Sequence, residues 1–289
     1  MANRFSKKEN SNPNAEMTFI DHLEALRWHI IRSLLAVVIL AILVFCFHGW
    51  IFAYIIEGPI NSNFITYRLF CKLGQILHTS TLCMNPVRVS MQTTTYTGQF
   101  LGAFTMAFLG GFLVASPYIF WEFWRFAKPA LKNKELKNSR FAIFWVSFFF
   151  LLGATFGYFV LGPFTFSFLA NFQISDLAGS IETRPTLNDY LKNLTNIVVF
   201  CGIAFELPVA AYVLTRIGII TPKFLTGKRK YAIVILLIVA AFITPSPDWI
   251  SQMIVFAPLM ILYEIGVAVS KKVAKEKAEK ERREQQEWS

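Results

Sequence analysis

A single carboxylate, Glu135, lies in a strongly basic segment between two long apolar stretches. The segment RFAKPALKNKELKNSRF, which runs from Arg125 to Phe141, carries six Lys or Arg residues and no other acid. A carboxylate can hold an arginine guanidinium through two parallel hydrogen bonds. A surface ion pair with a neighbouring lysine is worth at most about 1 kcal/mol, so an incoming arginine can displace it. The residues alone fit two interpretations, a solvated loop acid or a binding site for arginine.

A second carboxylate, Glu206, interrupts the apolar sequence CGIAFELPVAAY. A charged carboxylate in hydrocarbon is costly, so it must face a cavity, a partner or a hydrogen-bonding group. Pro208 removes a backbone donor two residues later and can kink a helix. We favour an intramembrane site for a polar residue of a partner protein, and an internally satisfied carboxyl is the alternative.

Catalytic and metal-binding patterns are missing from the sequence. It contains neither G-x-S-x-G nor H-E-x-x-H, and its four histidines (His22, His29, His48 and His78) lack ligand spacing. We therefore expect no enzymatic activity, no cofactor and no metal, and an intramembrane hydrolase is disfavoured.

Four cysteines divide into two pairs by context. Cys46 and Cys201 lie in apolar runs, where they are expected to pack as small core residues. Cys71 and Cys83 share one long loop, and we hypothesise that they form a disulfide on an oxidising side of a membrane.

The composition indicates a membrane protein. The chain of 289 residues is 55% hydrophobic and 16% charged, with 30 Phe, whereas soluble domains carry roughly a quarter charged residues. We expect an all-α polytopic protein with six transmembrane helices at about 28–56, 99–122, 140–163, 191–215, 230–244 and 249–270. Residues 1–270 would form one domain and 271–289 a charged cytoplasmic tail.

The expected helix ends carry further information. Pro59 and Pro163 are expected to end the helices that precede them. The last two helices have short apolar stretches, about 21 Å for the fifth. Such a pair either requires a thinner bilayer or partner proteins, or is a tilted, buried pair without functional consequence.

The distribution of positive charge gives the orientation. Lys and Arg number five up to Arg32, six from Arg125 to Arg140, five from Arg216 to Lys230, and seven in the tail from Lys271. The alternate connections carry three, two and none. By the positive-inside rule both termini are cytoplasmic. Because the net charge of +10 sits in these short connections, it does not indicate nucleic-acid binding.

Several segments together resemble one family. HLEALR at 22–27, SPYIFWEFWRFAKPALKNKE at 116–135, FELPVA at 205–210, ITPSPDWISQ at 243–252 and YEIGV at 263–267 occur in the order and spacing of TatC. TatC is the receptor subunit of the twin-arginine protein translocase, and the resemblance covers about residues 17–272.

The resemblance implies a curved, glove-like bundle in the cytoplasmic (inner) membrane. It implies that the chain binds twin-arginine signal peptides of folded precursors, recruits single-span TatA/TatB-type subunits, associates with itself and supports export driven by the proton-motive force. Glu135 matches the family acid that contacts the twin arginines, with Phe126 and Pro129 in its surroundings. Glu206 matches the intramembrane acid near the partner helix, and Arg27 belongs to the N-terminal motif. Further motif positions are Pro59, Pro208, Asp248 and Glu264.

One position departs from the family pattern, HL-x-E-L-R. Ala25 occupies the place of the acid, and Glu24 lies one residue earlier. One residue turns a helix by about 100°, so Glu24 points in another direction. Glu24 is nevertheless our candidate for the N-terminal part of the arginine site.

A secondary transporter of a small solute is the alternative function. Such proteins show repeated halves with broken helices around a midplane site. The two halves of this chain show no evident repeat, and Glu206 is the one acid well inside an expected helix. The translocase receptor is therefore the preferred function.

Overall fold

The computed structural model of the protein describes residues 19–61, 63–76, 91–127, 139–172, 184–245 and 249–287. Every regular element in these ranges is helical. The elements are α1 (Phe19–Cys46), α2 (His48–Ile51), η1 (Phe52–Ile56), η2 (Gly58–Ile60), α3 (Ile65–Ile76), α4 (Gly98–Ala127), α5 (Ser139–Phe156), η6 (Gly157–Leu161), α6 (Gly162–Asn171), α7 (Leu187–Ala204), α8 (Leu207–Ile217), α9 (Pro222–Gly227), α10 (Arg229–Ile243) and α11 (Trp249–Glu287).

The all-α polytopic architecture expected from the sequence is confirmed. Five helical segments of the described chain are long and apolar enough to cross a membrane: Leu23–Cys46, Gly98–Phe126, Ile143–Asn171, Leu187–Ile217 and Trp249–Lys280. The fifth expected span corresponds to α10, which has 15 residues. At 1.5 Å per residue α10 is about 22 Å long, shorter than about 30 Å of hydrocarbon.

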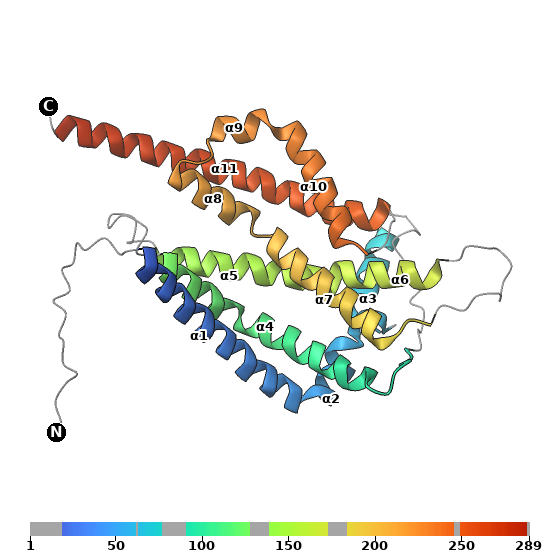
Figure 1. Cartoon of the computed structure of the whole chain (residues 1–289). Helices are drawn as coiled ribbons and strands as arrows, with labels where there is room; N and C mark the ends of the chain where they lie inside the picture. The colour runs from blue at the N-terminus through green and yellow to red at the C-terminus, as the bar shows by residue number, and fades with distance from the viewer. Residues whose placement is uncertain are drawn as a thin grey trace, which may run out of the picture.

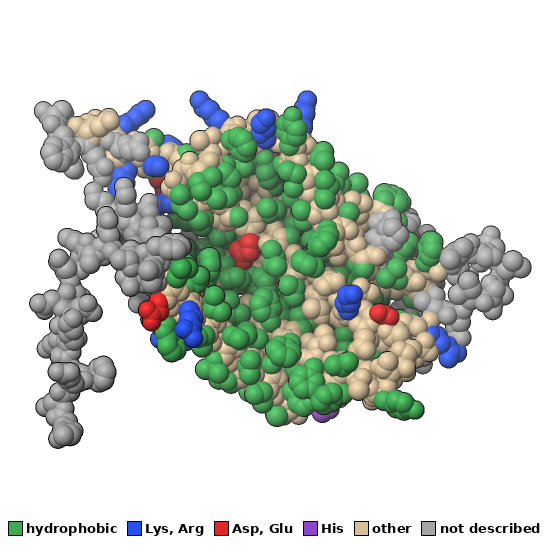
Figure 2. All heavy atoms as spheres, viewed as in Figure 1, with side chains coloured by type: hydrophobic (Ala, Val, Ile, Leu, Met, Phe, Trp, Pro, Cys, Tyr) green, Lys and Arg blue, Asp and Glu red, His purple; other side chains and the backbone are tan. Residues whose placement is uncertain are grey.

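Apolar side chains on the outer surface match this environment. On α1, Leu34, Leu35, Ile39 and Ile42 are more than half exposed. Hydrophobic side chains cover much of the face in Figure 2, and few charged side chains interrupt it. In water such a surface would drive aggregation, whereas in a bilayer it faces lipid.

The helix ends gather at two opposite ends of the molecule. Figure 1 shows the starts of α1 and α5 beside the end of α4 at the left, where the end of α11 projects beyond the bundle. The helices α2, α3 and α6 and the start of α7 lie at the right. The connections that are expected on opposite sides of a membrane thus leave the bundle at opposite ends.

The third long helix continues past the proline that was expected to end it. Pro163 lies in the first turn of α6, and α5, η6 and α6 follow one another without an intervening loop. A proline in a first helical turn sacrifices no intrahelical hydrogen bond, and the π-helical turn η6 absorbs the change of register. The expected boundary at 163 therefore differs from the structure, whose candidate span extends to Asn171.

The final helix is much longer than its apolar stretch. It continues from Trp249 through the charged tail to Glu287, 39 residues in all. The tail sequence KKVAKEKAEKERREQQE consists mostly of strong helix formers, and Lys275 and Glu279 lie 3.8 Å apart as an i,i+4 pair. The apolar part of α11, from Trp249 to the residue before Glu264, is nevertheless short, as the sequence indicated.

Small residues allow close packing between the long helices. A Cβ atom at Gly111 on α4 would lie 2.7 Å from the backbone nitrogen of Ala41 on α1. A Cβ atom at Gly153 on α5 would lie 2.5 Å from the carbonyl oxygen of Cys201 on α7. Both distances are too short for a side chain, so glycine is required at these two crossings.

Side-chain hydrogen bonds join α11 to the preceding helices. The hydroxyl groups of Thr215 on α8 and Ser270 on α11 are buried and 2.8 Å apart. The hydroxyl of Tyr263 donates to the carbonyl oxygen of Leu225 over 2.7 Å, and the side-chain amide of Gln252 donates to that of Leu237 over 3.0 Å. The last four helices therefore pack as one unit, as Figure 1 shows.

Candidate functional site

The principal candidate acid and some of its companions lie outside the described residues. Glu135 and Pro129 belong to the segment 128–138, and Asp248 belongs to 246–248. The helix ends that border the first segment, at Ala127 and Ser139, are described. They lie at the same end of the bundle as the start of α1 (Figure 1).

On α1 the acid of the N-terminal motif lies on an exposed face. Glu24 and Arg27 are both exposed, whereas Ala25 is half-buried on the side that carries His29 one turn later. Glu24 therefore lies on the outer face of α1, and Ala25 lies on the face toward the bundle. This is the rotation that a one-residue shift along a helix produces.

A buried carboxylate that was not among the expected site residues, Glu122 on α4, lies next to the face of α1 that carries His29. Its side chain on α4 is 1% exposed, and it forms a hydrogen bond and ion pair with Nδ1 of His29 on α1. The hydroxyl of Tyr118 donates to its other oxygen over 3.0 Å. A guanidinium nitrogen of Arg125 lies 3.6 Å from that same oxygen.

Part of this network could have been recognised in the sequence. Tyr118, Glu122 and Arg125 are spaced i, i+4 and i+7, which places them on one face of a helix. The contact with His29 depends on how α1 packs against α4. Since Gly111 and Ala41 set the closest approach of those helices, the pairing follows from tertiary structure and not from local spacing.

The network extends to the candidate residue Phe126. The ring of His29 meets that of Phe126 edge to face, with centroids 6.2 Å apart. Arg125 also lies over the ring of Trp121, 4.9 Å from its centroid. The end of α4 therefore presents an aromatic and cationic surface that rests on a buried Glu122–His29 pair.

The intramembrane acid Glu206 sits at a break between two helices. α7 ends at Ala204, α8 begins at Leu207, and Pro208 occupies the first turn of α8. Both carboxyl oxygens are inaccessible to solvent and lack a hydrogen-bond partner among the described residues. The backbone of Phe150 on α5 approaches the carboxyl without forming a hydrogen bond of ordinary geometry. The two interpretations of Glu206, a contact for a partner and an internally satisfied carboxyl, stay predictions.

Two further motif residues make structural contacts. Glu264 on α11 forms an ion pair with Arg229 at the start of α10, with 2.8 Å between nitrogen and oxygen. Pro59 is buried in η2, and its carbonyl oxygen lies 2.8 Å from the hydroxyl of Tyr67 on α3. The same hydroxyl lies 3.2 Å from the carbonyl oxygen of Pro163, so it shares its proton between the two turns.

The structure confirms the expected core position for Cys201 but not for Cys46, which lies near the end of α1 on the outer surface of the bundle. Cys201 is a buried free thiol, and Cys46 is a free thiol that is exposed on the surface of the bundle. Cys71 on α3 takes part in a disulfide. Its expected partner, Cys83, lies outside the described residues, so the Cys71–Cys83 pairing stays a prediction.

The family model that describes the Sec-independent protein translocase protein TatC matches residues 21–258. The chain belongs to the TatC family. This family is a membrane component of a translocase and not a family of enzymes, in agreement with the expectation from the sequence.

Individual members support this assignment over nearly the whole chain. The TatC protein of Blattabacterium sp. subsp. Periplaneta americana is 42% identical over 268 residues, which is 92% of this chain and 99% of that protein. The TatC protein of Carboxydothermus hydrogenoformans is 34% identical and matches 88% of this chain and 93% of its own length.

A solved structure shares the fold. The crystal structure of the twin arginine translocase receptor TatC matches with a TM-score of 0.65 and 30% identity, over 88% of this chain and all but 1% of that one. Because the identity and the coverage are both substantial, the resemblance found in the sequence motifs is confirmed.

Proposed function

We propose that this chain is the receptor subunit of a twin-arginine protein translocase that binds twin-arginine signal peptides of folded precursors. The observation that carries the proposal is the full-length match to TatC proteins, together with the receptor whose crystal structure shares the fold. The signal peptide binds to this chain at the end of the bundle where α1 begins and α4 ends. Both termini and this end face the cytoplasm, and the chain spans the inner membrane six times, with α10 as its short fifth span.

In this proposal Glu135 captures a guanidinium of the signal peptide. The two arginines need carboxylate partners, because a planar guanidinium is best held by two parallel hydrogen bonds. Glu24 on the exposed face of α1 is available to the peptide, together with Arg27, which orients the peptide backbone. Phe126 offers an aromatic edge to the residues that follow the arginines.

Glu122 is not a ligand of the peptide in this mechanism. It is buried and already bonded to His29 and Tyr118. We assign it a positioning role, since it fixes α1 against α4 and holds His29 under Phe126. The two helices that border the peptide site therefore keep a constant separation.

Glu206 is proposed as the contact for a single-span partner of the TatA/TatB type. A carboxyl without a partner at a helix break is a site where a polar side chain of another helix gains a hydrogen bond that the bilayer cannot supply. The short helix α10 and the apolar part of α11 favour the same assignment, because a locally thin bundle attracts partner helices or thins the bilayer.

Transport in inverted membrane vesicles tests the proposal. Vesicles that contain this chain and its co-purified single-span subunits should take up a folded precursor with a twin-arginine signal. They should not take up the same precursor when lysines replace the two arginines of its signal. Collapse of the proton-motive force by an ionophore should stop the uptake. Uptake that ignores the Arg-to-Lys exchange, or uptake of a small solute by the chain alone, would contradict the proposal.

A further inference from the structure

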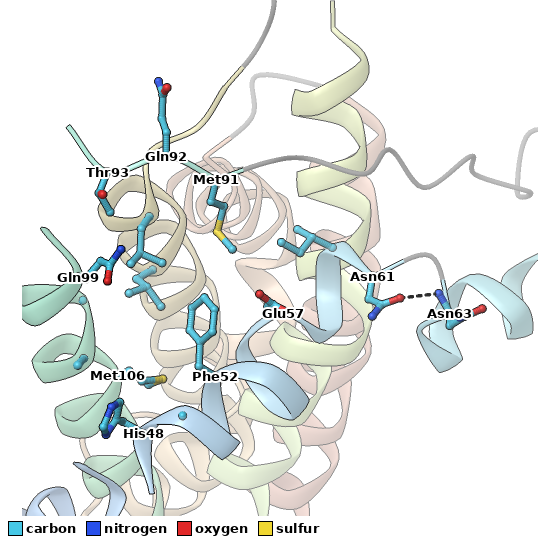
Figure 3. Close-up of a pocket in the computed structure, with 16 residues that line it drawn as sticks. His48, Phe52, Glu57, Asn61, Asn63, Met91, Gln92, Thr93, Gln99 and Met106 are labelled. Atoms are coloured by element: carbon cyan, nitrogen blue, oxygen red, sulfur yellow. Dashed lines mark hydrogen bonds between the residues drawn. The ribbon is translucent and has the colours of Figure 1, made fainter. Parts of the chain in front are cut away.

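A cavity of about 820 Å³ lies at the end of the bundle opposite to the proposed signal-peptide site. It is lined by residues of α2, η1 and η2, by residues 91–93, and by the starts of α4 and α7 (Figure 3). His48 and His29 are 19 residues apart along nearly continuous helix, which corresponds to about 28 Å. The cavity is within the size range of ligand sites and is too far away to belong to the cytoplasmic cluster.

The lining combines an apolar surface with amide, hydroxyl and imidazole groups and one carboxylate. Phe52, Met106 and Leu191 provide the apolar part. Glu57 is the one carboxylate among the described lining residues, and none of these is Lys or Arg. In a chain with a net charge of +10, a large cavity with a net negative lining favours a cationic ligand.

The carboxylate of Glu57 lies at the cavity without a positively charged partner in the described chain. It follows the π-helical turn η1, whose carbonyl oxygens at Ile55 and Ile56 accept hydrogen bonds from Tyr158 and Tyr190. These bonds fix the turn. The Glu57 side chain has no ion pair or hydrogen bond within the described chain, and Figure 3 shows it directed into the cavity.

His48 adds a second acceptor. Its Nδ1 lies 2.8 Å from the carbonyl oxygen of Phe45, so in the neutral ring Nδ1 carries the proton and Nε2 accepts.

The rim of the cavity includes a short edge of extended backbone that pairs with nothing on its outer side in the described ranges. Gln92 bridges residue 186, where its N–H donates to the carbonyl oxygen of Pro185 over 3.2 Å and its carbonyl oxygen accepts from the N–H of Leu187 over 3.0 Å. In such a bridge the N–H and C=O groups of the residues before and after Gln92 point away from residue 186. Those neighbours, Met91 and Thr93, line the cavity and make no backbone hydrogen bond to the described residues.

We propose that this cavity binds an extended stretch of polypeptide with one Lys or Arg side chain inserted into it. Glu57 meets the cation, Phe52 and Met106 cover the aliphatic stem, and the edge at Met91 and Thr93 pairs with the main chain of the ligand. The ammonium group of an aminophospholipid is the less favoured occupant, because its phosphate would find no Lys or Arg in the lining. The site is separate from the signal-peptide site, and its existence does not depend on the proposed function.

Binding of short fluorescent peptides to the purified full-length chain in detergent tests the proposal. The probe is the capped heptapeptide Thr-Val-Thr-Arg-Thr-Val-Thr, and its counterpart has Gln in place of Arg. The Arg peptide should bind at least tenfold more tightly than the Gln peptide. Glu57→Gln should weaken binding of the Arg peptide at least tenfold, whereas the charge-matched control Glu276→Gln, on the exposed tail of α11, should leave it unchanged.

A second variant distinguishes loss of the binding site from a folding defect. Ala103→Leu narrows the cavity without touching Glu57, and it should weaken binding while the variant elutes and melts like the parent chain. Equal binding of the two peptides, or equal binding by Glu57→Gln and Glu276→Gln, would overturn the proposal. Displacement of the Arg peptide by phosphatidylethanolamine but not by phosphatidylglycerol would assign the cavity to a lipid amine and also overturn it.

Discussion

The imidazole of His29 on α1 is hydrogen-bonded to the carboxylate of Glu122 on α4, and the carboxylate is almost completely buried. The two residues are 93 positions apart in the chain. Tyr118 donates to the second carboxylate oxygen, so both oxygens have partners. This relationship fixes the two helices that border the proposed peptide site, and it underlies the first prediction.

His29→Gln and Glu122→Gln should each destabilise the folded chain. A Gln in place of either partner replaces the charge-assisted hydrogen bond by a weaker one, whereas the double variant forms an amide–amide pair without an ionisable group. A double-mutant cycle of unfolding free energies in detergent should therefore give a coupling of about 1–3 kcal/mol. Additive effects of the two substitutions would show that the contact does not join the helices.

Gly153→Val should destabilise the crossing of α5 and α7. A Cβ atom there would lie 2.5 Å from the carbonyl oxygen of Cys201 and 2.7 Å from Cβ of Phe205, so the helices must separate. We expect a loss of about 1–3 kcal/mol in unfolding free energy. Gly227→Val is the matched control, because open space surrounds that glycine. Equal melting temperatures of the two variants would contradict the close approach.

Tyr67 should make the end of the bundle that contains η2 and α6 sensitive to alkaline pH. Burial raises the pKa of Tyr67 from 10.0 to about 12. Below pH 10 the phenol is neutral in both states, and its stabilising contribution is complete. As the pH rises toward 12 the unfolded chain releases this proton before the folded chain does, so this contribution is lost.

The corresponding measurement compares Tyr67→Phe with Tyr96→Phe. The first variant should lose about 1 kcal/mol at neutral pH, since two carbonyl oxygens lose their donor, and its stability should fall less steeply between pH 10 and 12. Tyr96 is fully exposed, so its variant should follow the parent chain. Identical pH profiles of all three proteins would argue against a buried phenol.

Glu206→Leu should impair recruitment of single-span partners and spare binding of a twin-arginine peptide. The substitution removes an acid whose oxygens have no partner in the described chain, so the folded chain itself should not lose stability. Co-purification of partner subunits from membranes measures the effect. Glu264→Leu provides a contrast, because it breaks the ion pair with Arg229 instead. Undiminished partner recovery with Glu206→Leu would refute its proposed role.

Features that depend on local sequence could be predicted from it. Long runs without charge gave the helical membrane fold, and the proline two residues after Glu206 gave the break between α7 and α8. The mixed-charge tail forms a helix as its composition indicates, although its continuity with α11 was not expected. These features depend on propensity and hydrophobicity, which act over short stretches.

Features that depend on packing could not be predicted. Pro163 does not end its helix, because a π-helical turn accommodates it. The partner of Glu122 lies on another helix, and the cavity beside Glu57 is assembled from segments that are distant in the chain. None of these contacts leaves a periodic pattern in one sequence, since each requires the relative placement of helices.

Binding of a twin-arginine signal peptide to the purified chain tests the central claim most directly. A labelled peptide should bind the parent chain and the exposed-acid control Glu276→Gln equally. Glu135→Gln should bind it about tenfold or more weakly, which corresponds to loss of a charge-assisted hydrogen bond, and a twin-lysine peptide should bind the parent chain weakly. If Glu135→Gln binds the twin-arginine peptide as tightly as the control does, Glu135 does not capture the arginines and the account is contradicted.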